Sequence, residues 1–363
     1  MTPLRIEDFD YQLPVAQIAQ HPLAERAASR LLLLERGKHS WEDRRFRQLP
    51  EILRGDELLV VNNARVLPAR LFGRRLGARA QAASRKSRMP GELLKAQIEV
   101  LLTREIRPGE WEALVRPGRK MQLGERVVFG SGELGAEVIG RGDFGQRRLR
   151  FTAAGNLHQL IESLGHMPLP PYIRRLDEES DRERYQTIFA REPGAVAAPT
   201  AALHFDAAML AELRSRGHEI SELTLHVGLG TFQPIRAGDI EAHRMHQEAY
   251  RIPEETAERI RLARREGRPV VAVGTTVVRA LEDAAHKHSG EVRGGEGEAE
   301  IFIRPGHTFC VVDQCLTNFH LPHSTLLVLV AAFAGREFVL EAYRHAVAAG
   351  YRFYSYGDCM LIR

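Results

Sequence analysis

The segment PVVAVGTTVVRALEDA places a glycine and two threonines directly after a short apolar run. The run predicts a buried strand that ends at Val273, and Gly274 permits a tight turn into a helix. We expect Thr275 and Thr276 to cap that helix, because threonine hydroxyls accept hydrogen bonds from its first N–H groups. A helix N-terminus at the carboxyl end of a strand attracts a carboxylate or a phosphate. Many such corners bind nothing, so this one is a candidate site.

A second glycine turn, HVGLGTFQP, also follows a predicted strand. Gly228 and Gly230 would let the backbone approach a ligand closely, and Thr231 supplies a hydroxyl. The third glycine of a dinucleotide-binding fingerprint is missing and no helix follows directly, so the spacing excludes that motif.

Histidines gather late in the chain. A neutral imidazole is suited to act as a general base near neutral pH. His243 and His246 are three residues apart with Glu248 near, which is compatible with a metal site, but neither an H-E-x-x-H motif nor paired cysteines accompany them. We therefore expect no metal, while a structural role stays open for each histidine. The candidates for the base are His204, His226 and His320.

The loop HMPLPPYIRR is stiff, because its three prolines restrict the backbone. It presents Tyr172 beside Arg174 and Arg175, which could stack on a base and hold a phosphate. A connector packed on the core is an equal alternative. The segments DRERYQT and NNARVLPAR carry many polar groups beside apolar runs, and these groups must pair with one another or with a ligand.

The elements that must position these residues alternate between strand and helix. Apolar runs predict strands at 31–35 and 57–63 and, later, at 220–227, 269–274, 300–303 and 309–319. Helix signals cover 156–165, 206–217, 253–267 and 275–288, with Asp206 as an N-cap. This alternation predicts a three-layer α/β/α domain with a mostly parallel sheet. The Gly- and charge-rich stretch 288–298 need not be ordered.

Residues 67–152 differ in character. Six short alternating segments follow one another there, separated by glycine, proline and charged turns, with no helix between them. They predict a small antiparallel β-barrel. We expect this barrel, residues 67–152, to interrupt a discontinuous α/β domain of residues 1–66 and 153–363.

Charge and targeting signals limit the class of protein. The net charge of +4 permits a polyanionic partner. Basic residues concentrate at 73–95, where seven face the single acid Glu92, so the loop 77–95 is either a mobile phosphate-binding loop or an idle insertion. No stretch is long and apolar enough to span a membrane, and the best candidate, 326–334, predicts a buried helix instead. The N-terminus lacks an export signal, so we expect a cytoplasmic protein. The three cysteines fit buried thiols.

The motifs together resemble a known family, the S-adenosylmethionine:tRNA ribosyltransferase-isomerases of queuosine biosynthesis. The resemblance covers nearly the whole chain, except that the basic stretch 78–95 looks longer than is usual in the family. It rests on eleven ordered segments: FDYQLPVAQIAQHPLAERAASRLLLLER, GDELLVVNNARVLPARLFG, WEALVRPGRK, GHMPLPPYIRR, DRERYQTIFA, GAVAAPTAALHF, LTLHVGLGTFQPIR, HRMHQEAY, VVAVGTTVVRALE, LTNFHLPHSTLLVLVAAFAG and YRFYSYGDCMLI.

The resemblance implies an α/β domain with an inserted barrel, and it implies a reaction. The ribosyl group of S-adenosylmethionine is transferred to a 7-aminomethyl-7-deazaguanine at the wobble position of tRNA with a GUN-type anticodon. Adenine and methionine leave, and epoxyqueuosine remains. S-adenosylmethionine is then a consumed substrate, and neither a cofactor nor a metal is required.

Residue roles follow from that chemistry as hypotheses. A base must take a 5′ proton that the sulfonium makes acidic, with His226 as the first choice over His204 and His320. Gly228, Gly230, Thr231, Gly274, Thr275 and Thr276 would hold the sulfonium ligand. Asp181, Tyr185 and Gln186 would contact the edge of the base. We assign phosphate or wobble-base contacts to Arg65, Arg70, Arg116, Arg174 and Arg279, with Arg85 and Lys86 as phosphate ligands in the basic loop.

Two other functions remain open at this point. A tRNA methyltransferase would use the same sulfonium ligand and transfer its methyl group. A non-catalytic RNA-binding protein would bind through the barrel, although it needs no glycine turns or histidines. A monomer is expected, since no apolar helix face is left over.

Overall fold

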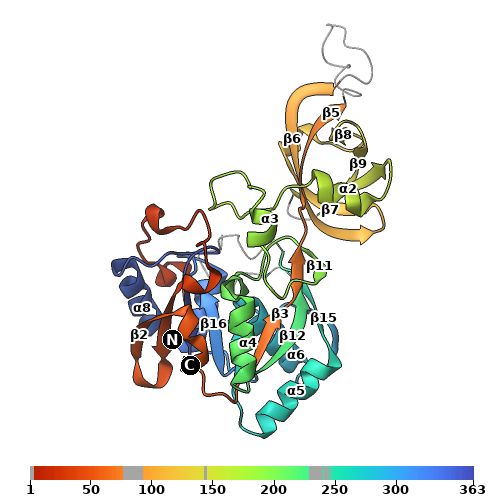
Figure 1. The fold of residues 1–363 in the computed structure, drawn as a ribbon. Coiled ribbons are helices and arrows are strands. Elements are labelled where there is room, and N and C mark those ends of the chain that lie inside the picture. Colours follow the sequence, from red (N-terminus) through yellow and green to blue (C-terminus); the bar gives the residue numbers. More distant parts are fainter. Residues whose placement is uncertain (1–3, 77–92, 143–144, 229–239, 241–244, 246) are drawn as a thin grey trace.

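The computed structural model describes residues 4–76, 93–142, 145–228, 240, 245 and 247–363. It contains one large sheet, one closed barrel and a pair of short strands. The barrel projects from one end of the sheet domain (Figure 1). Both expected units are present, and the barrel strands lie in the sequence between strands of the sheet.

The large sheet has nine strands in the order β15-β13-β12-β3-β14-β16-β17-β1-β2. Its centre, β12, β3, β14 and β16, is parallel, as expected of an α/β domain. Both edges contain antiparallel pairs, so the sheet as a whole is mixed. The strands span Arg30–Glu35 (β1), Ser40–Arg45 (β2), Leu58–Asn62 (β3), Glu219–Leu225 (β12), Glu248–Ile252 (β13), Val270–Val273 (β14), Gly295–Ala299 (β15), Gln314–Asn318 (β16) and Cys359–Ile362 (β17).

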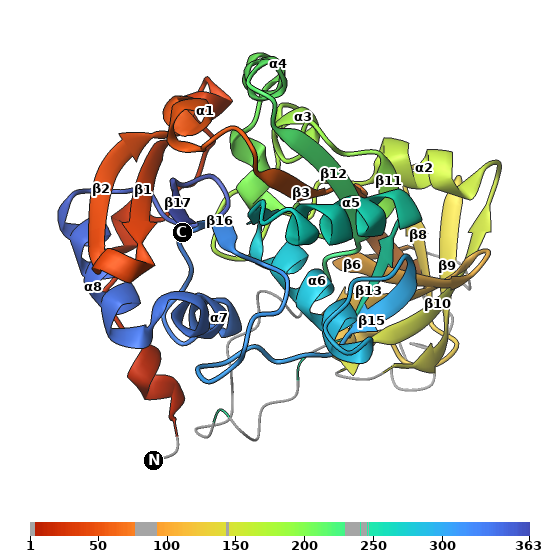
Figure 2. The same ribbon diagram turned by 90° about the horizontal axis from the view of Figure 1, so that it is seen from below.

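Helices cover both faces of this sheet. The alternation of side chains along β3 explains why: Leu58 and Val60 join one core cluster, and Leu59 and Val61 join the other. One face packs on α5 to α8 and the other on α1 and α4 (Figure 2). The helices span Leu49–Ile52 (α1), Ala207–Ser215 (α4), Glu254–Arg265 (α5), Thr275–Lys287 (α6), Thr325–Ala334 (α7) and Arg336–Ala348 (α8).

The barrel closes in the order β10-β7-β6-β5-β8-β9. All six predicted segments form its strands, which confirms the expected barrel. The helix α2, Leu157–Leu164, packs against its core through Ile161, with Asn156 as the N-cap. The strands span Arg70–Leu76 (β5), Leu93–Arg107 (β6), Glu110–Arg116 (β7), Arg126–Phe129 (β8), Leu134–Arg141 (β9) and Arg147–Ala153 (β10).

Short contacts connect the barrel to the sheet domain. The strand β4, Ala64–Val66, pairs with β11, Glu192–Ala195, just before the barrel begins. The amide of Gln186 then holds Val66 at both ends: Val66 N donates to Oε1 over 3.0 Å, and Nε2 donates to Val66 O over 2.7 Å. The segment that leads into the barrel, residues 64–66, is therefore anchored to the α/β domain.

Two predictions near residue 300 are wrong. Residues 295–299, in the stretch expected to need no order, form the edge strand β15, which pairs with β13 over five residues. Backbone pairing at a sheet edge does not require apolar side chains, and charged residues are common there. Residues 300–303, predicted as a strand, are irregular, because Glu300 N and Ile301 N donate to Asp283 Oδ1 and not to a neighbouring strand.

The expected buried helix near residue 326 is α7, capped by Ser324 Oγ, which accepts from Leu327 N over 3.2 Å. In the described part of the chain, no helix combines the length and apolarity needed to cross a bilayer. Cys315 and Cys359 are buried free thiols, as expected, and Cys310 is partly exposed.

Candidate functional site

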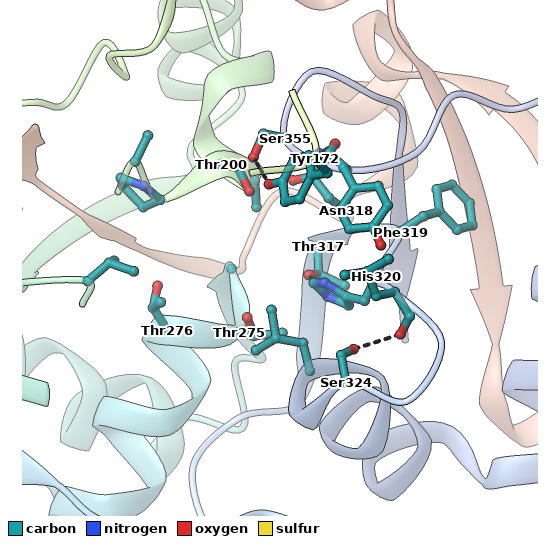
Figure 3. A pocket seen from close by; sticks show the side chains of 18 of the residues that line it. Tyr172, Thr200, Thr275, Thr276, Thr317, Asn318, Phe319, His320, Ser324 and Ser355 are labelled. Atoms are coloured by element: carbon teal, nitrogen blue, oxygen red, sulfur yellow. Dashed lines mark hydrogen bonds between the residues drawn. The ribbon is translucent and has the colours of Figure 1, made fainter. Parts of the chain in front are cut away.

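A pocket lies at the carboxyl ends of the central parallel strands. The space inside it that the centre of a water-sized sphere can occupy is about 70 Å³. Its wall is built from the ends of β14 and β16, the starts of α6 and α7, and residues 172, 198–201, 227 and 354–355 of further segments (Figure 3). Parallel strands deliver their carboxyl ends to one edge, which is where ligands bind in open α/β sheets.

The predicted glycine corner forms part of this wall. Gly274 has φ +100°, a conformation that residues with a side chain rarely adopt, and it is the N-cap of α6. The threonines are therefore not caps, contrary to our expectation: Thr275 and Thr276 are the first residues of the helix, and no side-chain cap bond forms. Both line the pocket beside the positive end of the helix dipole.

Three buried polar atoms of the pocket wall lack a hydrogen-bond partner among the described residues. They are Thr276 Oγ1, Asn318 Oδ1 and the Tyr354 hydroxyl oxygen. Buried polar groups are paired in nearly all native structures, and an unpaired one costs about 1–3 kcal/mol. A polar ligand in the pocket could pair with these atoms, which makes the pocket a candidate binding site.

His320 is the one candidate base that lines this pocket. Its Nε2 lies 2.9 Å from Thr317 Oγ1, and its backbone N–H donates to the Tyr343 hydroxyl over 3.1 Å. Burial lowers the pKa of His320 to about 3. The imidazole is therefore neutral at physiological pH and able to accept a proton or a hydrogen bond.

His204 lies behind the pocket and not in its wall. Its Nδ1 lies 2.8 Å from Ser29 Oγ, and its Nε2 lies 3.2 Å from Asn318 Nδ2. Burial, with a contribution from nearby arginines, lowers the pKa of His204 to about 3. With both ring nitrogens occupied, His204 has no direct access to a ligand.

His226 follows β12 but does not line the pocket, although the next residue, Val227, does. The ring packs against the backbone of Gly194, where an added Cβ would lie 2.9 Å from His226 Cε1. Burial lowers the pKa of His226, and nearby Glu192 opposes the shift. Gly228 N donates to Glu248 Oε1 over 3.2 Å. Gly230 and Thr231 lie outside the described residues.

The three residues predicted to contact the base edge are instead structural. Asp181 is fully buried and accepts two hydrogen bonds from Arg175, over 2.6 and 2.9 Å, and a third from Tyr356 over 2.7 Å. Tyr185 is fully buried in the adjoining core cluster. The amide of Gln186 is engaged by Val66. The polar groups of Asp181 and Gln186 therefore hydrogen-bond to other protein groups, which is one of the two alternatives that the sequence left open.

The basic residues predicted to contact tRNA differ in burial and in partners. Arg279 is 3% exposed, forms an ion pair with Glu248 and donates to Ala299 O over 3.0 Å, so it is a core residue and not a tRNA ligand as we predicted. Arg65 pairs with Glu162 over 3.0 Å and Arg70 with Glu99 over 3.3 Å. Arg116 and Arg174 are exposed. Arg85 and Lys86 lie outside the described residues.

Asn318, Tyr354 and Ser355 line the pocket but were not singled out by the sequence analysis, whereas Tyr172 was. Tyr172 and Tyr354 stack with ring centroids 4.2 Å apart, and the Tyr172 hydroxyl lies 2.5 Å from Ser355 Oγ. Asn318 ends β16. The available signal was the change from apolar to polar residues in LTNFH, which marks a strand end facing a site.

No group of three or more potential metal ligands occurs within the described ranges. His243 and His246, the pair considered for a metal, lie outside them.

Comparisons with known proteins agree with this architecture. The family model described as queuosine biosynthesis protein matches residues 6–362. The chain belongs to this family. Its resemblance to the S-adenosylmethionine:tRNA ribosyltransferase-isomerases is confirmed by relatives of that name that cover 99% of the chain.

Relatives carry that same name. The chain is 52% identical over 363 residues to the S-adenosylmethionine:tRNA ribosyltransferase-isomerase of Solibacter usitatus, covering 99% of this chain and 100% of the relative. It is 50% identical over 360 residues to the one of Moorella thermoacetica, with the same coverage. The crystal structure of the S-adenosylmethionine tRNA ribosyltransferase from Thermotoga maritima matches with a TM-score of 0.52 and 36% identity, covering 98% of this chain and 100% of that one.

The low pKa of His320 predicts a pH-dependent stability. Its folded value, about 3, lies below the value of about 6.5 in an unfolded chain. The unfolded state therefore binds the proton first as the pH falls, and stability is lost between about pH 6.5 and pH 3. From pH 8 to pH 5, the wild type should lose about 2 kcal/mol more free energy of unfolding than His320→Gln. Urea unfolding at both pH values measures this, and equal losses would contradict it.

Proposed function

We propose that the chain transfers and isomerises the ribosyl moiety of S-adenosylmethionine onto a 7-aminomethyl-7-deazaguanine at the wobble position of tRNA. Adenine and methionine are released, and epoxyqueuosine remains in the tRNA. The observation that carries this proposal is the pocket with three unpartnered polar atoms beside the Gly274 corner. Family membership and full-length relatives of the same name support it.

The pocket has the features that this substrate needs. The first turn of α6 offers N–H groups and a positive dipole end to the methionine carboxylate. The stacked rings of Tyr172 and Tyr354 offer aromatic faces to adenine or to the sulfonium cation. Since the sulfonium itself acidifies the 5′ carbon, the protein only has to hold the ligand and to move a proton.

His320 is the base in this proposal, in place of His226. It lines the pocket within reach of a bound ligand, and burial keeps the ring unprotonated, although the same low pKa makes it a weaker base than a free imidazole. Because the pKa is low, the protonated ring is a strong acid and can pass the proton to departing adenine. The bonds from ribose to adenine and from the 5′ carbon to sulfur break, and methionine leaves with the sulfur electron pair. The aminomethyl nitrogen loses a proton and bonds to a ribosyl carbon, and the ribosyl carbons and their oxygen close the epoxide-bearing five-membered ring.

The partners of the reaction are proposals of the same kind. We propose that tRNA with a GUN-type anticodon approaches the face where the barrel meets the sheet domain. Exposed Arg116, at the end of β7, and Arg174, two residues beyond the pocket residue Tyr172, would hold its phosphates. We also propose that the protein acts as a monomer in the cytoplasm.

The transferred group distinguishes this activity from methyl transfer. The chain should place label from the ribose of S-adenosylmethionine into tRNA that carries the aminomethyl base, with one adenine released for each ribosyl group transferred. Separate incubations with ribose-labelled and methyl-labelled substrate measure the transfer. Label from the methyl group in tRNA would establish a methyltransferase, and the absence of adenine release would leave a tRNA-binding protein.

Loss of the proposed base should slow the chemistry more than binding. His320→Gln keeps hydrogen-bonding atoms but removes the basic ring, so kcat for adenine release should fall by about 10²–10⁴. His226→Gln, outside the pocket wall, is the matched control and should lose less than about tenfold. The reverse pattern in single-turnover rates would move the base to His226.

The exposed residues Arg116 and Arg174 should account for part of the salt dependence of tRNA binding. The double variant Arg116→Ala/Arg174→Ala should lower tRNA affinity and reduce the slope of log K against log salt by about 1.5–2, the value for two lost phosphate contacts. Arg259→Ala is the control, because Arg259 lies on α5 at the other end of the molecule from the barrel (Figure 1) and pairs with Glu255. Filter binding at several salt concentrations measures the slope. An unchanged slope removes both arginines from the interface.

A further inference from the structure

Asn318 ends β16 with an amide whose orientation is determined by its surroundings. Its Nδ2 lies 3.0 Å from Tyr354 O, 3.4 Å from Asp358 O and 3.2 Å from His204 Nε2. Backbone carbonyl oxygens only accept hydrogen bonds, so the amide nitrogen, and not the amide oxygen, must face them. The oxygen therefore points to the other side.

His204 completes this arrangement from behind. Its Nε2 must accept from the Asn318 amide, which places the ring proton on Nδ1, where Ser29 Oγ lies at 2.8 Å. Burial lowers the pKa of His204 to about 3, so the ring stays neutral and keeps this accepting nitrogen. The ring is also held by Phe46, with centroids 5.2 Å apart. His204 thus presents one fixed acceptor to Asn318.

The amide oxygen of Asn318 has no such partner. The residue is 3% exposed and lines the pocket, and its Oδ1 accepts no hydrogen bond from any residue that the structure describes. A buried acceptor left unpaired is costly, and a ligand in the pocket would relieve that cost.

We propose that Asn318 Oδ1 is a specificity-determining acceptor for a hydrogen-bond donor of the bound nucleoside ligand, and that His204 is the positioning residue that keeps this oxygen turned toward the pocket. The inference rests on the proposed function for the identity of the ligand. His204, which the sequence analysis predicted as a base, then acts on the ligand only indirectly, by orienting Asn318.

The chemistry of the subsite follows from the amide orientation. Both amide hydrogens are engaged behind the pocket wall, so Asn318 offers only an acceptor. It selects a group that carries N–H or O–H and disfavours one that carries only lone pairs, because two facing acceptors repel. S-adenosylmethionine has three such groups: the 6-amino group of adenine, the α-ammonium of methionine and the ribose hydroxyls.

The first test is the dissociation constant of S-adenosylmethionine, measured by calorimetry on the full chain. Asn318→Leu removes the acceptor at similar volume and should weaken binding by about tenfold or more. Asn63→Leu is the matched control, because Asn63 is also buried but pairs with Glu222 and Thr224 away from the pocket. It should lower the unfolding midpoint and leave the dissociation constant unchanged. Equal constants for wild type and Asn318→Leu overturn the acceptor role.

The second test separates positioning from simple structural support, and it decides the matter if Asn318→Leu does not fold. His204→Phe retains a ring against Phe46 but removes the acceptor, so the amide can turn and the KM for S-adenosylmethionine should rise several-fold while kcat changes little. His204→Gln restores an acceptor oxygen and should return KM to within about twofold of wild type. Wild-type KM in His204→Phe, or no rescue by His204→Gln, overturns the positioning role.

The third test identifies the donor. Analogues that lack the 6-amino group, the α-amino group or a ribose hydroxyl are bound to wild type and to Asn318→Leu. The analogue without the true donor should bind wild type about tenfold more weakly and show no further loss in the variant, which is the signature of a coupled pair. Losses that add independently for all three analogues overturn the proposal.

Adenine release by the wild type is measured in parallel. If the wild type binds S-adenosylmethionine but releases no adenine in the presence of tRNA, the proposed function fails and the binding tests still decide the role of Asn318. If adenine is released and Asn318→Leu binds as tightly as wild type, the inference fails alone.

Discussion

Parallel pairing of β3 with β12 and β14, and of β14 with β16, is the constraint on which the candidate site depends. These strands come from four distant parts of the chain, and parallel pairing brings their carboxyl ends to one edge. The Gly274 corner, Asn318 and Val227 meet there only because the strands run in the same direction. The antiparallel strands at the two edges widen the sheet, but none of their residues lines the pocket.

Burial controls the chemistry of the residues that gather at this edge. Desolvation keeps His204 and His320 neutral, and the same burial makes each unpaired polar atom costly. The pocket therefore combines neutral acceptors with a helix N-terminus. Such a combination suits a ligand that carries both a carboxylate and several N–H or O–H donors, as the proposed substrate does.

Much of the framework could be predicted from the sequence. Apolar runs and turn residues gave the central strands, five of the helices and all six barrel strands, because these patterns depend on local periodicity and burial. The Gly274 corner was also predictable, since a strand, a glycine and a helix follow one another within a few residues. Predictions failed where the partner lies far away in sequence. The polar segment 295–299 pairs with β13 and forms β15. The backbone N–H groups of residues 300 and 301 donate to Asp283, so these residues do not form the predicted strand.

The roles of individual polar residues were decided only by tertiary structure. By itself, the sequence determined the family, the α/β platform with its barrel, and the types of residue available for chemistry. It could not tell that Asp181 and Arg279 are paired in the core, that His320 lines the pocket, or that His204 stands behind Asn318. The physical reason is that a polar side chain takes its role from its partners and its burial, and in this chain those partners lie many residues away in sequence.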